Sequence, residues 1–128
     1  MAYYFRKTLE GHFDDAIRRT TQALQDEGFG IITDIDIKDT LHRKLAVDFR
    51  NYRILGACNP KLAFEALRIE DKIGTMLPCN VVVQEVGENS IEVAAIDPVA
   101  SMQAIDSPVL KEKAEHVRSM LRDVINRL

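Results

Sequence analysis

The sequence predicts an α+β domain in which helices cover one sheet of about five strands, at least partly antiparallel. Short β-rich runs alternate with segments of helical periodicity, and two of these runs are joined by a three-residue turn. The chain then ends in a long amphipathic helix. Because a hairpin is antiparallel, this pattern argues against a doubly wound parallel fold and favours two layers, a sheet against helices.

The first elements are a strand, a helix and a second strand. Residues 3–9 mix aromatic and charged residues, as a strand does. Apolar positions recur at helical spacing from Phe13 to Glu27, and Gly28 provides a left-handed stop for this helix. Residues 29–35 alternate apolar with small or polar residues and are expected to form the second strand.

A short helix and a third strand come next. Residues 36–45 are expected to form the helix, with Asp36 as its cap and with Leu41 and Leu45 facing inward. Residues 52–58 are expected to form the strand.

The clearest helix start follows this strand, at Asn59-Pro60. Asn is a preferred cap, and Pro is favoured at the first helical position because its missing N–H has no helical partner there. The helix is expected to end near Asp71, before a loop over residues 72–78. Its predicted buried stripe comprises Leu62, Ala63, Ala66 and Leu67.

A hairpin and a capped helix complete the chain. Residues 79–86 and 90–97 are β-rich and flank the turn at residues 87–89. The last helix begins at Ser107-Pro108, a second cap-plus-proline signal. Its apolar face is expected to comprise Leu110, Ala114, Val117, Leu121, Val124 and Leu128.

Length and composition are those of one small domain, over residues 1–128. The 128 residues are 46% hydrophobic and 29% charged, with a net charge of −3, which is ordinary for a globular protein. Nucleic-acid binding normally needs a basic field, so we expect no nucleic-acid partner. Without a signal peptide or a long apolar run, we expect a cytoplasmic protein with no membrane partner.

Other short motifs have structural explanations. Gly28-Phe29-Gly30 ends a helix and begins a strand, which is the reverse of a phosphate-binding loop. His12, His42 and His116 are scattered and lack the spacing of a metal site.

Two Cys-Asn dipeptides, Cys58-Asn59 and Cys79-Asn80, are the chemically distinctive feature of the chain. Cys58 closes the third strand and Cys79 opens the fourth. The intervening helix spans about 18 Å at roughly 1.5 Å per residue, and the loop after it returns at most about 25 Å. If the two strands are antiparallel neighbours, both dipeptides meet beside the helix that begins at Pro60.

Three interpretations of this pair remain open. A helix N-terminus lowers a thiol pKa, so the two thiols could bind a small ligand or a soft metal. They could instead cycle through a disulfide in a thiol-dependent redox enzyme. In the third interpretation both Cys are packed in the core and Asn59 only caps its helix, since free Cys is often buried and inert.

The chain resembles the domain of unknown function 302 family through most of its length. The resemblance is carried by YRILGACNPKLA at residues 52–63, by LPCNVVV at residues 77–83, and by VAAIDP at residues 93–98 with Met102. It implies a fold like that of the TATA-box-binding protein, a curved antiparallel sheet in the order strand, helix, four strands, helix. It also implies a homodimer, and it assigns no reaction and no cofactor.

The sequence therefore predicts a small binding module with a pocket for a small ligand or a metal. The candidate ligand-binding residues are Cys58, Asn59, Pro60, Cys79 and Asn80, and the candidate metal ligands are Cys58 and Cys79.

Overall fold

One five-stranded sheet organises the fold of the computed structural model, which describes residues 2–128. The strand order is β1-β5-β4-β3-β2, and every neighbouring pair is antiparallel. This confirms the predicted α+β class, with its antiparallel sheet and its strand, helix, four strands, helix order extended by short helices. The strands are β1 (Tyr4–Glu10), β2 (Gly30–Asp36), β3 (Tyr52–Cys58), β4 (Cys79–Gly87) and β5 (Ser90–Ile96).

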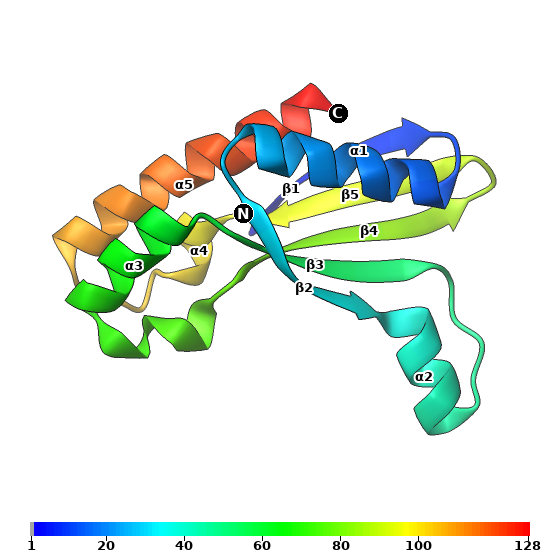
Figure 1. Cartoon of the computed structure of the whole chain (residues 1–128), viewed down its shortest axis with the longest axis horizontal. Helices are drawn as coiled ribbons and strands as arrows, with labels where there is room; N and C mark the ends of the chain where they lie inside the picture. Colours follow the sequence, from blue (N-terminus) through cyan, green and yellow to red (C-terminus); the bar gives the residue numbers. More distant parts are fainter. Residues whose placement is uncertain (1) are drawn as a thin grey trace.

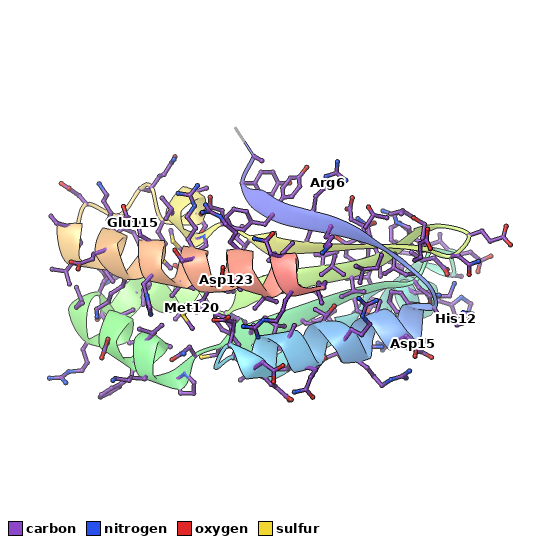
Figure 2. All side chains as sticks on the ribbon, turned by 90° about the horizontal axis from the view of Figure 1, so that it is seen from above. Arg6, His12, Asp15, Glu115, Met120 and Asp123 are labelled. Atoms are coloured by element: carbon purple, nitrogen blue, oxygen red, sulfur yellow. The ribbon has the colours of Figure 1, made fainter. Side chains whose placement is uncertain are left out.

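Two long helices cover one face of the sheet. Figures 1 and 2 show α1 and α5 side by side above the strands, with α3 and α4 beyond one end of the sheet. Across residues 2–128, each helix is too short or too polar to pass through a bilayer. The helices are α1 (Phe13–Asp26), α2 (Ile37–Leu45), α3 (Pro60–Ile69), the 3-10 helix η1 (Asp71–Met76), α4 (Pro98–Ser101) and α5 (Pro108–Arg127).

The main core lies between this sheet face and the two long helices. Alternate residues of a strand point to the same face, so every second residue of the central strands is buried here. The helices close the core with residues spaced three or four apart. The core includes Leu55, Val81, Val83, Ile91, Val93 and Ala95 from the sheet, and Ala16, Leu24, Leu121 and Val124 from the helices.

A second, smaller core lies beyond the end of the sheet. Ala66 of α3, Ile73 of η1 and Leu110 of α5 are its buried residues. The half-buried side chains packed around them are Met76, Leu77, Met102 and Ile105. The α3–η1 segment thus packs mainly on the first turns of α5.

The predicted helix starts are confirmed by their caps. Asn59 Oδ1 accepts a hydrogen bond from the Leu62 N–H at 3.1 Å, and Ser107 Oγ accepts one from the Leu110 N–H at 3.3 Å. Asp36 Oδ1 likewise caps α2. The turn after α1 has φ +94° at Gly28, a conformation that favours glycine.

The predicted burial of α2 is wrong. Every residue from Ile37 to Leu45 is exposed or half-buried, and Leu45 is 65% exposed. Figure 1 shows α2 projecting from the end of β2, away from the other helices. The apolar spacing predicts the helix correctly. The hydrophobic core that would bury its apolar side chains does not extend to this end of the sheet.

Several further expectations need correction. The helix expected to end near Asp71 ends at Ile69, and η1, residues 71–76, occupies most of the predicted loop at 72–78. Residues 98–101 form α4, which the sequence analysis does not predict. Leu67 was expected in the buried stripe of α3 and is 41% exposed, because α3 lies past the sheet and buries a narrow face. The overlooked signal for α4 is Asp97-Pro98, where Asp97 Oδ1 accepts a hydrogen bond from the Val99 N–H.

Candidate functional site

The backbones of the two Cys-Asn dipeptides meet at one end of the sheet. Strands β3 and β4 pair antiparallel, with Ala57 opposite Cys79 and Gly56 opposite Asn80. The start of α3 follows immediately at Asn59-Pro60. Strand pairing therefore brings the two segments together at the N-terminus of α3, as the sequence predicts.

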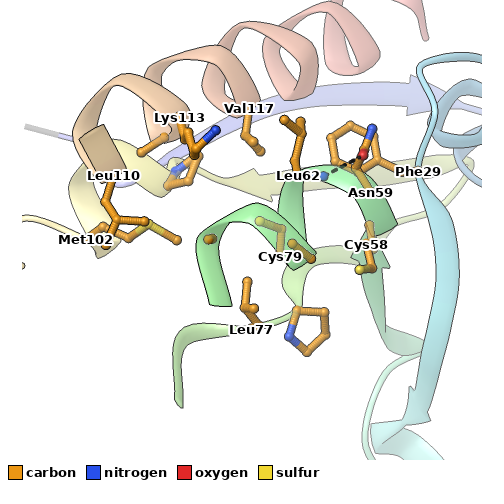
Figure 3. Close-up of a pocket in the computed structure, with 16 residues that line it drawn as sticks. Phe29, Cys58, Asn59, Leu62, Leu77, Cys79, Met102, Leu110, Lys113 and Val117 are labelled. Carbon is orange, nitrogen blue, oxygen red and sulfur yellow. Dashed lines mark hydrogen bonds between the residues drawn. The ribbon is translucent and has the colours of Figure 1, made fainter. Parts of the chain in front are cut away.

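A pocket opens beside this junction. It lies between α3, the first half of α5 and the end of the sheet, and Figure 3 shows it in close-up. Its cavity volume is about 50 Å³, so it is a narrow space that opens to solvent. The lining residues come from six segments of the chain: Phe29, Ala57, Cys58, Asn59, Leu62, Ala63, Ala66, Leu77, Pro78, Cys79, Pro98, Met102, Leu110, Lys113, Ala114 and Val117.

The pocket walls are mostly carbon. Small residues of α3 and α5, including Ala63, Ala66 and Ala114, leave the space that larger side chains would fill. Among its polar groups, Asn59 is already engaged. Its Oδ1 caps α3, and its Nδ2 lies near Gly28, where an added Cβ would be 3.3 Å away. Asn59 thus fixes the start of α3 against the α1–β2 turn.

The two thiols do not converge. Cys79 and its partner Ala57 occupy the same sheet face, so strand alternation directs the Cys58 side chain away from Cys79. Figure 3 shows the two side chains pointing in different directions. Both are free thiols; Cys79 is 8% exposed and Cys58 is half-buried.

Burial raises the pKa of the Cys79 thiol from 9.0 to about 11, with a smaller rise caused by the nearby Cys58. The sequence predicts that the helix N-terminus lowers the thiol pKa, whereas at Cys79 the pKa is raised. Desolvation of the thiolate outweighs the helix dipole there. Cys79 is protonated at neutral pH and is a poor nucleophile.

Two of the candidate site residues lie outside the pocket. Asn80 is exposed and lies on the open sheet face, in a hollow that Tyr52 and Val82 also line. Pro60 occupies the first position of α3 and is exposed. The residues brought together at the pocket are thus Cys58, Asn59 and Cys79.

The described residues give no support for a metal site with three or more of the usual side-chain ligands. Within residues 2–128, no group of three or more His, Cys, Asp or Glu side chains is placed to hold one. His12 lies at the start of α1, at the far end of the molecule from α3 (Figure 2). A metal at Cys58 and Cys79 would thus have at most these two thiols as its ligands from such side chains.

The α5 side of the pocket contains functional candidates that sequence reasoning missed. Lys113 lines the pocket, and its Nζ donates a hydrogen bond to Glu65 Oε2 of α3 at 2.7 Å. This bond and the positive charge of Lys113 lower the pKa of Glu65. The available signal was the position of Lys113, three residues after Leu110 and beside the apolar stripe of α5.

Asp97 supports the opposite wall. It is 5% exposed, and besides capping α4 its Oδ2 lies 3.3 Å from the Nε of Arg118 on α5. Two residues that follow it, Pro98 and Met102, line the pocket. The buried carboxylate therefore holds α4 where it closes the pocket.

Comparisons with known proteins agree on the fold. The model of the family described as Domain of unknown function DUF302 matches residues 5–128. The crystal structure of an uncharacterized conserved protein DUF302 from Bacillus stearothermophilus is similar, with a TM-score of 0.90 and 25% sequence identity. The similarity covers 99% of this chain and 98% of that chain. No curated protein matches. Because the family model spans nearly the whole chain, this protein belongs to the DUF302 family.

Proposed function

We propose that this protein is a binding module for a small, mainly apolar molecule held in the pocket between α3, α5 and the sheet. The observation that carries the proposal is the pocket itself, a concave and carbon-lined space at the junction of the two Cys-Asn segments. Such pockets, apolar with few polar groups, are the usual form of small-molecule sites.

The construction of the pocket supports this proposal. Its walls come from α3, α4, α5 and the strand ends, and the Asn59 and Asp97 caps hold two of these elements. Alanines line the helix faces that enclose the space. Binding would bury apolar ligand surface, which contributes about 25 cal/mol per Å² before the entropic cost of association.

Metal and thiol chemistry receive less support. A soft-metal site needs several ligands, and within residues 2–128 no group of three or more His, Cys, Asp or Glu side chains is placed to hold a metal. A thiol-dependent redox enzyme needs a reactive thiolate, whereas the buried Cys79 has a raised pKa. Under the remaining alternative, a purely structural domain, the space would be a packing gap without affinity.

The test is an NMR titration with 1-octanol, a neutral probe. Backbone amide shifts are expected to change at Leu62, Ala66 and Ala114, and to saturate with concentration. Ala63→Phe should abolish this response, because Ala63 is a half-buried pocket residue and the added ring would occupy the space.

Arg68→Phe is the matched control. It adds the same ring to α3 at an exposed position outside the pocket, so octanol binding should persist. Shifts scattered over the surface, or equal binding by the Ala63→Phe variant, would exclude the pocket as a ligand site and favour a structural role.

We also propose a homodimer formed through the β2–α2 arm, residues 30–47. Four apolar side chains of the arm are 43–65% exposed: Ile32, Ile35, Leu45 and Val47. An isolated helix as short as α2 is marginal in water, and β2 is an edge strand with unpaired backbone groups. Asp34 of the arm is already paired with Arg53 of the same chain, so the exposed apolar side chains would form most of a twofold contact.

Sedimentation equilibrium tests the dimer. The wild-type protein should sediment as a dimer, and Ile32→Lys with Leu45→Lys should yield a folded monomer. Val109→Lys, at an exposed apolar position of α5, should remain dimeric. A monomeric wild type, or a dimer that tolerates both arm substitutions, would contradict this interface. A cytoplasmic location and a TATA-box-binding-protein-like fold stay predictions from the sequence.

A further inference from the structure

One charged side chain lines the pocket within the described residues 2–128, and it is the ammonium-bearing Lys113. The side chain is 28% exposed, so its stem lies along the wall while its head reaches water at the side of α3. Figure 3 shows Lys113 on α5, above the space that Leu110 and Met102 enclose.

Among the described residues, the lining contains no carboxylate to compete with a bound anion. Burial also keeps the Cys79 thiol protonated. The anionic partner of Lys113 is Glu65 of α3, whose side chain is 37% exposed and does not line the pocket. An anionic group at the mouth would therefore meet one cation and no carboxylate within the pocket.

We propose that the pocket selects an apolar carboxylate, such as a medium-chain fatty acid, with its chain inside and its carboxylate on Lys113. The inference rests on the proposed binding function and specifies its ligand class. The carbon-lined walls accept the chain, and the ammonium group accepts the head at the mouth, where water still solvates the rest of the carboxylate.

Glu65 then competes with the ligand carboxylate for Lys113. In the free protein, Glu65 Oε2 accepts a hydrogen bond from Lys113 Nζ at 2.7 Å. The carboxylate of a bound ligand must share or replace this contact. Glu65 thereby holds the mouth of the empty pocket together and weakens binding. The two residues of one ion pair are expected to have opposite effects on affinity, which a purely structural ion pair would not produce.

The experiment compares octanoate with 1-octanol at pH 7, below the critical micelle concentration, on four forms of the folded protein. For the wild type, octanoate should bind about threefold or more tightly than octanol, the scale of a partly exposed ion pair. Lys113→Gln should remove this preference, and Glu65→Gln should increase octanoate affinity by a similar factor. Lys113→Arg should retain the preference, and octanol binding to each form is the reference against which its octanoate binding is compared.

The two levels of the hypothesis fail differently. If neither octanol nor octanoate binds the pocket, the proposed binding function itself is wrong. If octanol binds and octanoate binds no better, the pocket is a ligand site but the carboxylate assignment is overturned. If both Lys113→Gln and Glu65→Gln weaken octanoate equally with octanol, the ion pair only braces α3 against α5, and the assignment is again overturned.

Discussion

Gly56 of β3 lies directly against Pro78, the residue that leads into β4. A Cβ atom on Gly56 would be 2.6 Å from Pro78 Cγ and would overlap the side-chain oxygen of Thr33 on β2. The absence of a side chain at position 56 lets the residues before β4 pass close to β3. This approach brings Cys79 into register with Ala57 and shapes the sheet end of the pocket.

Gly56→Ala should therefore destabilise the fold. The new methyl group would push against a proline ring and a neighbouring strand, and overpacking of this kind costs about 1–3 kcal/mol. Urea denaturation measures the loss. Adding Thr33→Ala should recover part of it, because it removes one of the two overlaps. Gly30→Ala is the control: its Cβ would lie 3.9 Å from the nearest atom, so its effect should stay within about 0.5 kcal/mol. Unchanged stability in Gly56→Ala would contradict this account.

The sequence predicts where the helices and strands lie better than it predicts which elements pack against one another. Helix starts at Asn59-Pro60 and Ser107-Pro108 depend on local capping, and local signals suffice to find them. The hairpin turn is equally local, although it spans residues 88–89 and not the predicted 87–89, because Gly87 belongs to β4 and pairs with Ser90. The exposure of Leu45 depends instead on whether another layer lies opposite α2, and no pattern within the helix encodes that.

The sequence predicts the candidate site only in part, because the site depends on how separate elements pack together. Antiparallel pairing brought the Cys58 and Cys79 backbones together, but the thiols diverge because the register places Cys79 opposite Ala57. A shift of one residue reverses the face of a side chain, and the register could not be derived from the sequence. Lys113 and Met102 become pocket residues only through the packing of α5 and α4 around α3.

Asn59→Ala should destabilise α3 and the pocket that it covers. The substitution removes the Oδ1 acceptor of the Leu62 N–H, and loss of such a cap costs about 1 kcal/mol. Urea denaturation should show this loss together with weaker octanol binding. Asn59→Asp keeps an acceptor at the same place and should retain most of the stability. Equal stability of the Ala variant and the wild type would show that the cap is dispensable.

Cys79 should make the fold less stable at alkaline pH. The thiol ionises near pH 9 in the unfolded chain and near pH 11 in the folded protein, because burial disfavours the thiolate. The unfolded state therefore releases its proton first, and stability falls as pH rises from 9 to 11, by about 2 kcal/mol in total. Denaturation at several pH values, compared with Cys79→Ala, isolates this contribution from those of other titrating groups. Parallel pH profiles for the two proteins would refute it.

Asp97→Ala should affect both stability and binding. The substitution removes the cap of α4, a hydrogen bond to a charged group of the kind that costs about 1.5–3 kcal/mol to lose. It also leaves Arg118 without its buried ion-pair partner. Because Pro98 and Met102 line the pocket, loosening α4 should also weaken octanol binding in the NMR titration.

Two further variants separate the roles of Asp97. Asp97→Asn keeps an oxygen for the Val99 N–H but removes the charge facing Arg118, so its stability should lie between those of the wild type and the Ala variant. Asp106→Ala, at an exposed position between α4 and α5, should leave stability and binding unchanged. If Asp97→Ala lowers stability while octanol affinity is preserved, α4 does not depend on this carboxylate to close the pocket.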